Sequence, residues 1–201
     1  QQLFPREGET RPRLRFPEFR DAGEWDSKPL EEVCDLKAGD FVQAAEIAQQ
    51  PGEGMFPCYG GNGLRGYVTT FTHSGRFVLI GRQGALCGNV NLFDHKFHAT
   101  EHALVATPKP NIYVDWLYYG LIALKLNRFA TGQAQPGLSV SVLNSVDVCV
   151  PENENEQQRI ADCLSSLDAL IDAQAKKLDA LRTHKRGLMQ QLFPSPEADK
   201  S

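Results

Sequence analysis

The sequence lacks several features that would place it in a familiar class of protein. Its longest apolar runs, such as residues 77 to 80, are only a few residues long, whereas a membrane-spanning helix needs ~20. No basic stretch followed by an apolar core opens the chain, so nothing indicates a secretory signal. The five cysteines are widely spaced and form no C-x-x-C pair. This pattern favours reduced thiols in a cytoplasm over a disulfide framework.

The usual motifs of catalysis are missing as well. There is no Pro-Pro pair, which excludes the N/D-P-P-aromatic loop of amino methyltransferases, and there is neither a Walker lysine motif nor G-x-S-x-G. Hydrophobic residues make up 41% and charged residues 23% of the 201 positions, which excludes wholesale disorder. The sequence therefore indicates a folded chain of about one domain with no convincing catalytic centre.

Two stretches match functional patterns only in part. Residues 61 to 66 fit the G-x-G-x-x-G of dinucleotide sites, but the strand-like residues 67 to 71 follow where a helix should begin. His98, Glu101 and His102 fit the H-x-x-E-H zinc pattern, which needs both histidines on one long helix. A Gly-rich loop and a strand or turn explain these stretches better, although a zinc hydrolase using the three residues stays open as an alternative.

Charge is unevenly distributed along the chain, whose formal net charge is −4. Residues 21 to 53 carry nine acidic and two basic side chains. Residues 60 to 130 carry seven basic and three acidic side chains, together with four histidines. A local positive excess of this kind can meet phosphates even on an acidic chain.

Side chains that can read DNA bases gather in three clusters within or near this basic region. Arginine pairs with guanine edges, and Asn or Gln pairs with adenine edges, in the major groove. Glycines flank each cluster and would let the backbone approach a phosphate closely. The expected DNA contacts are Asn62, Arg65 and Tyr67; Arg82, Gln83 and Asn89; and Arg128, Gln133, Gln135 and Ser139.

Short elements of both kinds are expected between residues 25 and 151, which predicts a small α+β domain. Pro29 suits the first turn of a short helix, and Asn111 could cap a longer one. The expected elements are a helix over 27–35, strands over 67–71, 76–80, 86–93 and 102–107, a helix over 111–126, and a strand over 146–150.

A single long helix is predicted from residue 154 to 193, spanning ~60 Å at 1.5 Å per residue. Asn153 with Glu156 would form a capping box at its start. Apolar residues repeat in alternating steps of four and three, which is typical of a coiled coil, and a lone helix cannot bury such a seam. The seam comprises Ile160, Leu164, Leu167, Ile171, Gln174, Leu178, Leu181, Lys185, Leu188 and Leu192.

The two ends of the chain share a short sequence, because residues 1 to 5 return as residues 190 to 194. Internal repeats of this kind point to a repeated architecture, so we interpret the chain as the second half of a two-repeat protein. The expected divisions are the end of an upstream helix with a linker (1–19), a compact domain (20–151), the long helix (152–194) and a flexible tail (195–201).

The arrangement resembles one half of a specificity subunit of type I restriction-modification systems. The resemblance extends over residues 20 to 194 and is carried by loose motifs in a specific order. They are Phe56-Pro57-Cys58-Tyr59-Gly60-Gly61-Asn62-Gly63, Gly81-Arg82-Gln83-Gly84, Ala99-Thr100-Glu101-His102, Gln135-Pro136-Gly137-Leu138-Ser139, and residues 151–193 with Glu156-Gln157-Gln158-Arg159-Ile160.

The resemblance implies a target recognition domain followed by a spacer helix. Family members usually hold two such units, each reading one half of a split site in double-stranded DNA, with methyltransferase subunits bound to the helices. It implies no cofactor in this chain, because S-adenosylmethionine, ATP and Mg²⁺ serve the methyltransferase and restriction (translocase) subunits. It also implies a prokaryotic cytoplasm and no membrane partner.

The sequence thus predicts a DNA-binding chain without catalysis, whose helix pairs with the other half of a specificity subunit or with a second copy of itself. A coiled-coil assembly or regulatory protein that never touches DNA is the main alternative. DNA binding that strengthens steeply at low salt would distinguish the two.

Overall fold

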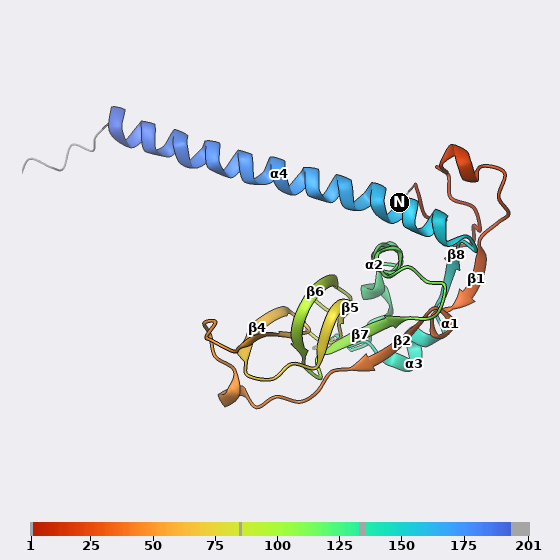
Figure 1. The fold of residues 1–201 in the computed structure, drawn as a ribbon, viewed down its shortest axis with the longest axis horizontal. Coiled ribbons are helices and arrows are strands. Elements are labelled where there is room, and N and C mark those ends of the chain that lie inside the picture. The colour runs from red at the N-terminus through yellow and green to blue at the C-terminus, as the bar shows by residue number, and fades with distance from the viewer. Residues whose placement is uncertain (1, 85, 133–135, 194–201) are drawn as a thin grey trace, which may run out of the picture. The chain divides into compact units, whose positions relative to one another are not determined.

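The computed structural model describes residues 2–84, 86–132 and 136–193 (Figure 1). The chain divides into two units, Gln1–Ala161 and Asp162–Ser201. The first unit therefore includes the opening turns of the long helix, beyond the expected boundary at residue 151. The expected tail at 195–201 lies outside the described residues.

The first unit is an α+β domain, as the sequence predicts. Its strands are β1 (Asp26–Pro29), β2 (Cys34–Ala38), β3 (Phe56–Gly60), β4 (Gly63–Val68), β5 (His73–Gly81), β6 (Val90–Ala99), β7 (Ala103–Pro108) and β8 (Asp147–Val150). Its helices are α1 (Leu30–Val33), α2 (Val114–Ala123), α3 (Val140–Asn144) and the start of α4 (Glu154–Leu192), with 3-10 turns at Pro17–Phe19, Ala44–Glu46 and Leu126–Phe129.

Six strands form the main sheet in the order β2-β7-β5-β6-β3-β4, and β1 pairs with β8 in a separate two-stranded sheet. Neighbouring strands are antiparallel except β3 and β6, which run parallel. Helix α2 packs against β5, β6 and β7. It buries Trp116, Leu117 and Leu121 completely or nearly so, and each such side chain stabilises the domain by about 1.5–3 kcal/mol.

Several expected elements are confirmed and others are wrong in their bounds. Residues 76–80, 102–107 and 146–150 fall almost entirely within β5, β7 and β8. The expected strand over 67–71 ends at Val68, and the one over 86–93 begins only at Val90. The residues before Val90 instead form a loop, in which Gly84 and Gly88 take left-handed φ angles of 88°.

The helix expected over 27–35 is wrong in most of its length. Only Leu30–Val33 is helical, because residues 26–29 pair with β8 and residues 34–38 pair with β7. Pro29 has extended angles and precedes the helix instead of lying in its first turn. Strand pairing here overrides the local helical pattern.

The helix expected over 111–126 is shorter at both ends. Asn111 has a left-handed φ of 66° and lies outside the helix, so it does not cap α2. Tyr113 occupies the N-cap position, and its side chain makes no capping hydrogen bond. At the other end, Lys125 takes a φ of 52° and separates α2 from the following 3-10 turn.

Helix α4 agrees with the sequence expectation, since it runs unbroken over 39 residues. Asn153 caps it, because its Oδ1 accepts a hydrogen bond from the Asn155 amide at 2.9 Å. The reciprocal half of the capping box is absent, as the Glu156 side chain bonds elsewhere. No helix among the described residues is long and apolar enough to span a membrane.

The N-terminal segment was expected to be the end of an upstream helix, but residues 2–16 contain neither helix nor strand. The segment is part of the first unit and packs on its core. The Phe4 ring is buried beside the rings of Trp25 and Trp116.

Candidate nucleic-acid interface

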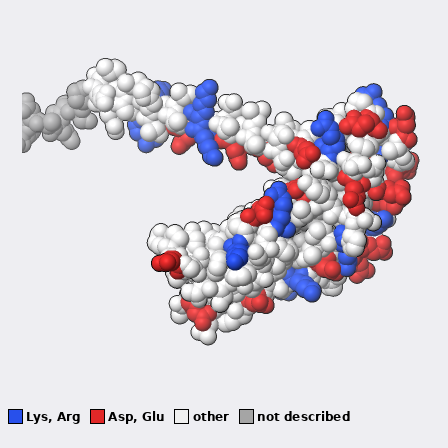
Figure 2. All heavy atoms as spheres, in the orientation of Figure 1, with Lys and Arg blue, Asp and Glu red and all other residues white. Residues whose placement is uncertain are grey.

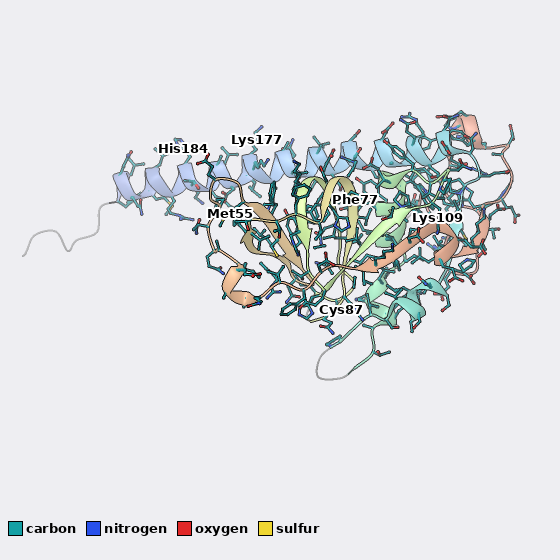
Figure 3. The ribbon with its side chains drawn as sticks, turned by 60° about the horizontal axis from the view of Figure 1, so that its bottom comes forward. Met55, Phe77, Cys87, Lys109, Lys177 and His184 are labelled. Carbon is teal, nitrogen blue, oxygen red and sulfur yellow. The ribbon has the colours of Figure 1, made fainter. Side chains whose placement is uncertain are left out.

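Loops that are distant in sequence converge at one end of the main sheet. The Arg82 amide, after β5, donates a hydrogen bond to the His102 carbonyl at 2.9 Å, and the Arg82 carbonyl accepts one from the Leu138 amide at 2.8 Å. The side-chain oxygen of Asn62, between β3 and β4, accepts a bond from the Leu86 amide at 3.3 Å. In Figure 3, Cys87 marks this loop end of the sheet, and Lys109 follows the opposite end of β7. The structure thus brings together the loops of Asn62 and Arg82 from the first two predicted clusters, and the backbone of Leu138, which precedes Ser139 of the third.

Glycines permit these loops to touch. A Cβ atom on Gly81 would lie 2.3 Å from the Gly61 carbonyl oxygen, and one on Gly61 would lie 2.6 Å from the Gln83 carbonyl oxygen. Real side chains do not tolerate such distances, so only glycine fits at either position. These glycines therefore allow one loop to approach another. A close approach of the backbone to a phosphate, as expected from the sequence, is not needed to explain them.

The predicted contact residues of the first two clusters differ in exposure. Asn62, Arg65 and Asn89 are exposed, whereas Tyr67, Arg82 and Gln83 are half-buried. The Arg82 Nε donates to the Leu138 carbonyl at 3.3 Å, which ties its guanidinium to the third loop. Tyr67 lies on β4, where its backbone pairs with Ala48.

The third cluster is only partly joined to the others. Arg128 faces the N-terminal segment, since its guanidinium pairs with the Glu7 carboxylate at 2.7 Å and lies over the Phe129 ring. The Ser139 hydroxyl lies 2.6 Å from that of Ser141, just before α3. Gln133 and Gln135 lie outside the described residues.

The charge of the loop end is moderately positive. Arg65 and Arg82 are accompanied there by His102, whose ring pairs with Glu101 at 3.2 Å. On the face drawn in Figure 2, acidic side chains gather at the side where the N-terminal segment and β1 lie. Part of the acidic stretch 21–53 nevertheless borders the loop end, since Asp40 pairs with Thr100 and Ala48 pairs with Tyr67.

The zinc alternative loses its structural basis. His98 is the penultimate residue of strand β6, and Glu101 and His102 lie in the turn before β7, not on the long helix that the pattern requires. The His98 Nδ1 faces the Thr70 hydroxyl at 3.3 Å. Across the described ranges, no group of three or more His, Cys, Asp or Glu side chains is placed to hold a metal ion.

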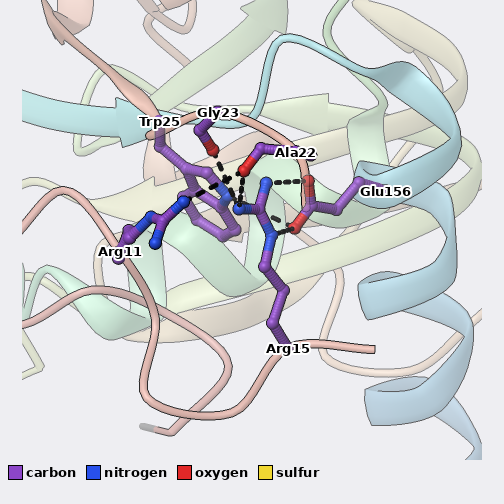
Figure 4. A network of polar contacts seen from close by, with 6 residues as sticks. All are labelled: Arg11, Arg15, Ala22, Gly23, Trp25 and Glu156. Atoms are coloured by element: carbon purple, nitrogen blue, oxygen red, sulfur yellow. Dashed lines mark hydrogen bonds and ion pairs between the residues drawn. The ribbon is translucent and has the colours of Figure 1, made fainter. Parts of the chain in front are cut away.

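A second site fixes the start of α4, and the sequence patterns did not reveal it (Figure 4). The Arg15 guanidinium donates two 2.7 Å bonds to the carboxylate of Glu156, and two 2.8 Å bonds to the carbonyls of Ala22 and Gly23. The Trp25 indole also donates to Glu156, at 3.3 Å. The hydrogen bonds with Glu156 raise the pKa of Arg15 above its ordinary value, although burial acts against this.

Gln157, the next residue, is also buried and bonds only to backbone groups. Its side-chain oxygen accepts from the Tyr113 amide at 2.8 Å, and its side-chain nitrogen donates to the carbonyls of Asn111 and Pro151. The heptad pattern contained a signal for this residue, because one step of three back from Ile160 reaches Gln157. No such signal exists for Arg15, whose partner is 141 positions away.

The apolar seam of α4 divides into a buried and an exposed part. Ile160 is only 2% exposed within the first unit, so this position packs in the domain core instead of meeting a second helix as expected. Leu164 is half-buried. The following apolar positions are 44–70% exposed: Leu167, Ile171, Leu178, Leu181, Leu188 and Leu192. Gln174 and Lys185 interrupt this exposed seam.

Comparison with known proteins agrees with the resemblance seen in the sequence. The family described as Type I restriction modification DNA specificity domain matches residues 22–183. The type I restriction enzyme EcoprrI specificity subunit of Escherichia coli is 43% identical over 161 residues, which are 80% of this chain and 39% of that protein. A putative type I restriction enzyme specificity subunit of Haemophilus influenzae is 28% identical over 149 residues, 72% of this chain and 38% of that one.

The fold also has a solved counterpart. The S subunit of a type I restriction-modification system from M. genitalium superimposes with a TM-score of 0.71 at 22% identity, covering 89% of this chain and 48% of that one. The chain thus spans less than half the length of each of these relatives. The family match over most of the chain, the Escherichia coli relative and the shared fold lead to one conclusion: the chain belongs to the type I restriction-modification DNA specificity family.

Proposed function

We propose that this chain acts as one half of a type I specificity subunit and reads one half of a split site in double-stranded DNA. The observation that supports the proposal is the convergence, at one end of the sheet, of separated loops that carry Asn62 and Arg82. The role is one of binding, with chemistry left to partner chains.

The exposed loop residues supply the reading groups. Arg65 would donate to guanine, and Asn62 and Asn89 would pair with adenine. The half-buried Arg82 is oriented by the Leu138 carbonyl, so less of its freedom would be lost on binding. Phosphate contacts from the same loops would set the position of the domain along the duplex.

Helix α4 would hold two such domains at a fixed spacing. Its exposed seam calls for a second helix, supplied by the other half of a specificity subunit or by a second copy of this chain in a homodimer. Methyltransferase and restriction subunits, with S-adenosylmethionine, ATP and Mg²⁺, would assemble on this framework in a prokaryotic cytoplasm. A symmetric dimer would read two copies of one half-site.

The test begins with selection of bound duplexes from a random-sequence pool by the full chain. We expect Arg65→Ala to weaken binding to the selected duplex by about 5- to 150-fold, corresponding to the ~1–3 kcal/mol of a good base contact. We expect Arg82→Ala to weaken it as well. Arg20→Ala, an exposed arginine in the N-terminal segment, is the matched control and should bind as the parent does.

Two results would overturn the proposal. If Arg65→Ala and Arg82→Ala both bind as tightly as the parent, the loop assignment is wrong. If the parent binds no duplex even at low salt, where phosphate contacts are strongest, the chain is a coiled-coil assembly or regulatory protein instead.

A further inference from the structure

The same three residues occur near both ends of the described chain in different environments. Gln2-Leu3-Phe4 and Gln191-Leu192-Phe193 are identical in sequence. Phe4 is 8% exposed, whereas Leu192 is 70% and Phe193 is 75% exposed. The phenylalanine of the first copy is therefore buried, and the phenylalanine of the second copy is exposed.

Phe4 occupies an aromatic pocket built by the two tryptophans of the chain. Its ring centroid lies 6.0 Å from that of Trp25, edge to face, and 6.1 Å from that of Trp116. Gly120 also lies beside the ring, since a Cβ atom there would be in ordinary van der Waals contact with the Phe4 Cε1, at 3.7 Å. The backbone beside it is also held, since the Gln2 carbonyl accepts a bond from the Leu14 amide at 2.9 Å. The domain thus holds both the Phe4 ring and the backbone that precedes it.

Phe193 cannot reach the pocket of its own chain. The pocket lies at the start of α4, because the Trp25 indole bonds to Glu156 in the first turn. The part of the helix from Asp162 to Leu192 alone is about 46 Å long at 1.5 Å per residue. The far end of a straight helix of this length cannot return to its beginning, whatever direction the helix takes. A pocket for Phe193 must therefore belong to another molecule or another domain.

We propose that Gln191-Leu192-Phe193 is a docking segment, which seats Phe193 in the equivalent aromatic pocket of a second recognition domain. The occupied pocket of this chain is the argument for that partner, because it already holds the phenylalanine of the same three-residue sequence. The inference rests on the proposed function only in naming the partner as a recognition domain. The contact would be additional to the helix seam and requires a second recognition domain whose pocket is empty. A second copy of this chain, whose pocket holds Phe4, does not meet this requirement.

The test uses the full chain with Phe4→Ala, which empties the pocket, and a fluorescent peptide of residues 185–196. We expect this variant to bind the peptide about tenfold or more tightly than the parent chain, whose pocket is filled. A peptide with Phe193→Ala keeps the apolar seam residues and is the matched control. It should bind the variant about tenfold or more weakly than the unaltered peptide.

Thermal melting first establishes that the variant is folded. If Phe4→Ala is not, Phe4→Val replaces it, because valine keeps a small apolar side chain and still leaves most of the space of the Phe4 ring empty. Failure of the folded variant to bind, or equal binding of both peptides, overturns the docking proposal. Neither outcome depends on DNA, so a failure here is distinguishable from a failure to read a duplex.

Discussion

The buried ion pair between Arg15 and Glu156 offers the sharpest test of how α4 is attached to the recognition domain. Their side chains are 10% and 2% exposed, and the guanidinium contacts the carboxylate through two nitrogens. Glu156→Ala would leave the guanidinium and the Trp25 indole without their shared acceptor. The cost of leaving a buried charge unpaired is about 3–5 kcal/mol.

The structure places the expected loss at the lower end of that range. Arg15 would keep its two bonds to the carbonyls of Ala22 and Gly23 at 2.8 Å, so part of its charge stays solvated by the protein. We therefore expect Glu156→Ala to lower the free energy of unfolding by about 3 kcal/mol. Glu156→Gln keeps an acceptor but loses the charge, and should cost about 1.5 kcal/mol.

Urea unfolding followed by tryptophan fluorescence measures these losses, since Trp25 lies in the network itself. Glu154→Ala is the matched control, because Glu154 is an exposed carboxylate in the same first turn. It reports the helix-dipole contribution alone, about 0.3–1 kcal/mol. Equal losses for Glu156→Ala and Glu154→Ala would refute the reasoning. A double variant, Arg15→Met with Glu156→Met, should be more stable than Glu156→Ala, as no lone charge remains.

Three further predictions concern other parts of the chain. Burial raises the pKa of Cys34 from 9.0 to about 12. The stability that the protein gains from keeping this buried thiol protonated is therefore complete below pH 9 and is lost as pH rises toward 12. Stability should fall there by up to about 1.4 kcal/mol per pH unit, and the fall should be shallower in Cys34→Ala. Gly81→Ala should lower the free energy of unfolding by about 1–3 kcal/mol or more, because the added Cβ would meet the Gly61 carbonyl. Gly23→Ala is the control and should be neutral, since Gly23 has open space around it. Equal melting temperatures of the two variants would contradict this prediction. Leu178→Ala should weaken self-association, measured by sedimentation, by about tenfold or more. A parent chain that stays monomeric at micromolar concentration would contradict helix pairing through the exposed seam.

The long helix could be predicted from sequence because its signals are local. A cap, a repeated apolar step and the absence of proline all lie within the segment, and α4 runs from Glu154 to Leu192 much as expected. The short elements were harder, because distant partners decide them. Residues 34–38 form a strand only because β7 lies beside them, and nothing within the segment indicates that partner.

The candidate site was predictable in its residue types but not in its geometry. Arginines and amides between glycines pointed to loops, and the loops of Asn62, Arg82 and Leu138 do meet. The position of Arg128 could not be foreseen, because its contact with Glu7 joins segments 121 positions apart. The closeness of Arg128 to glycines in the sequence therefore did not indicate where its side chain lies.

One stripe along α4 serves two purposes, and this explains why the heptad pattern continues without a break into the domain. Gln157 and Ile160 lie on the seam but are buried in the first unit, where they fix the first turns of the helix. From Leu167 onward the same stripe is exposed and needs another helix. The same helix thus contributes its first turns to the core of the first unit and its remaining turns to the second unit. Substitutions before Leu164 should therefore act on the stability of the domain, and those after it on pairing with a second helix.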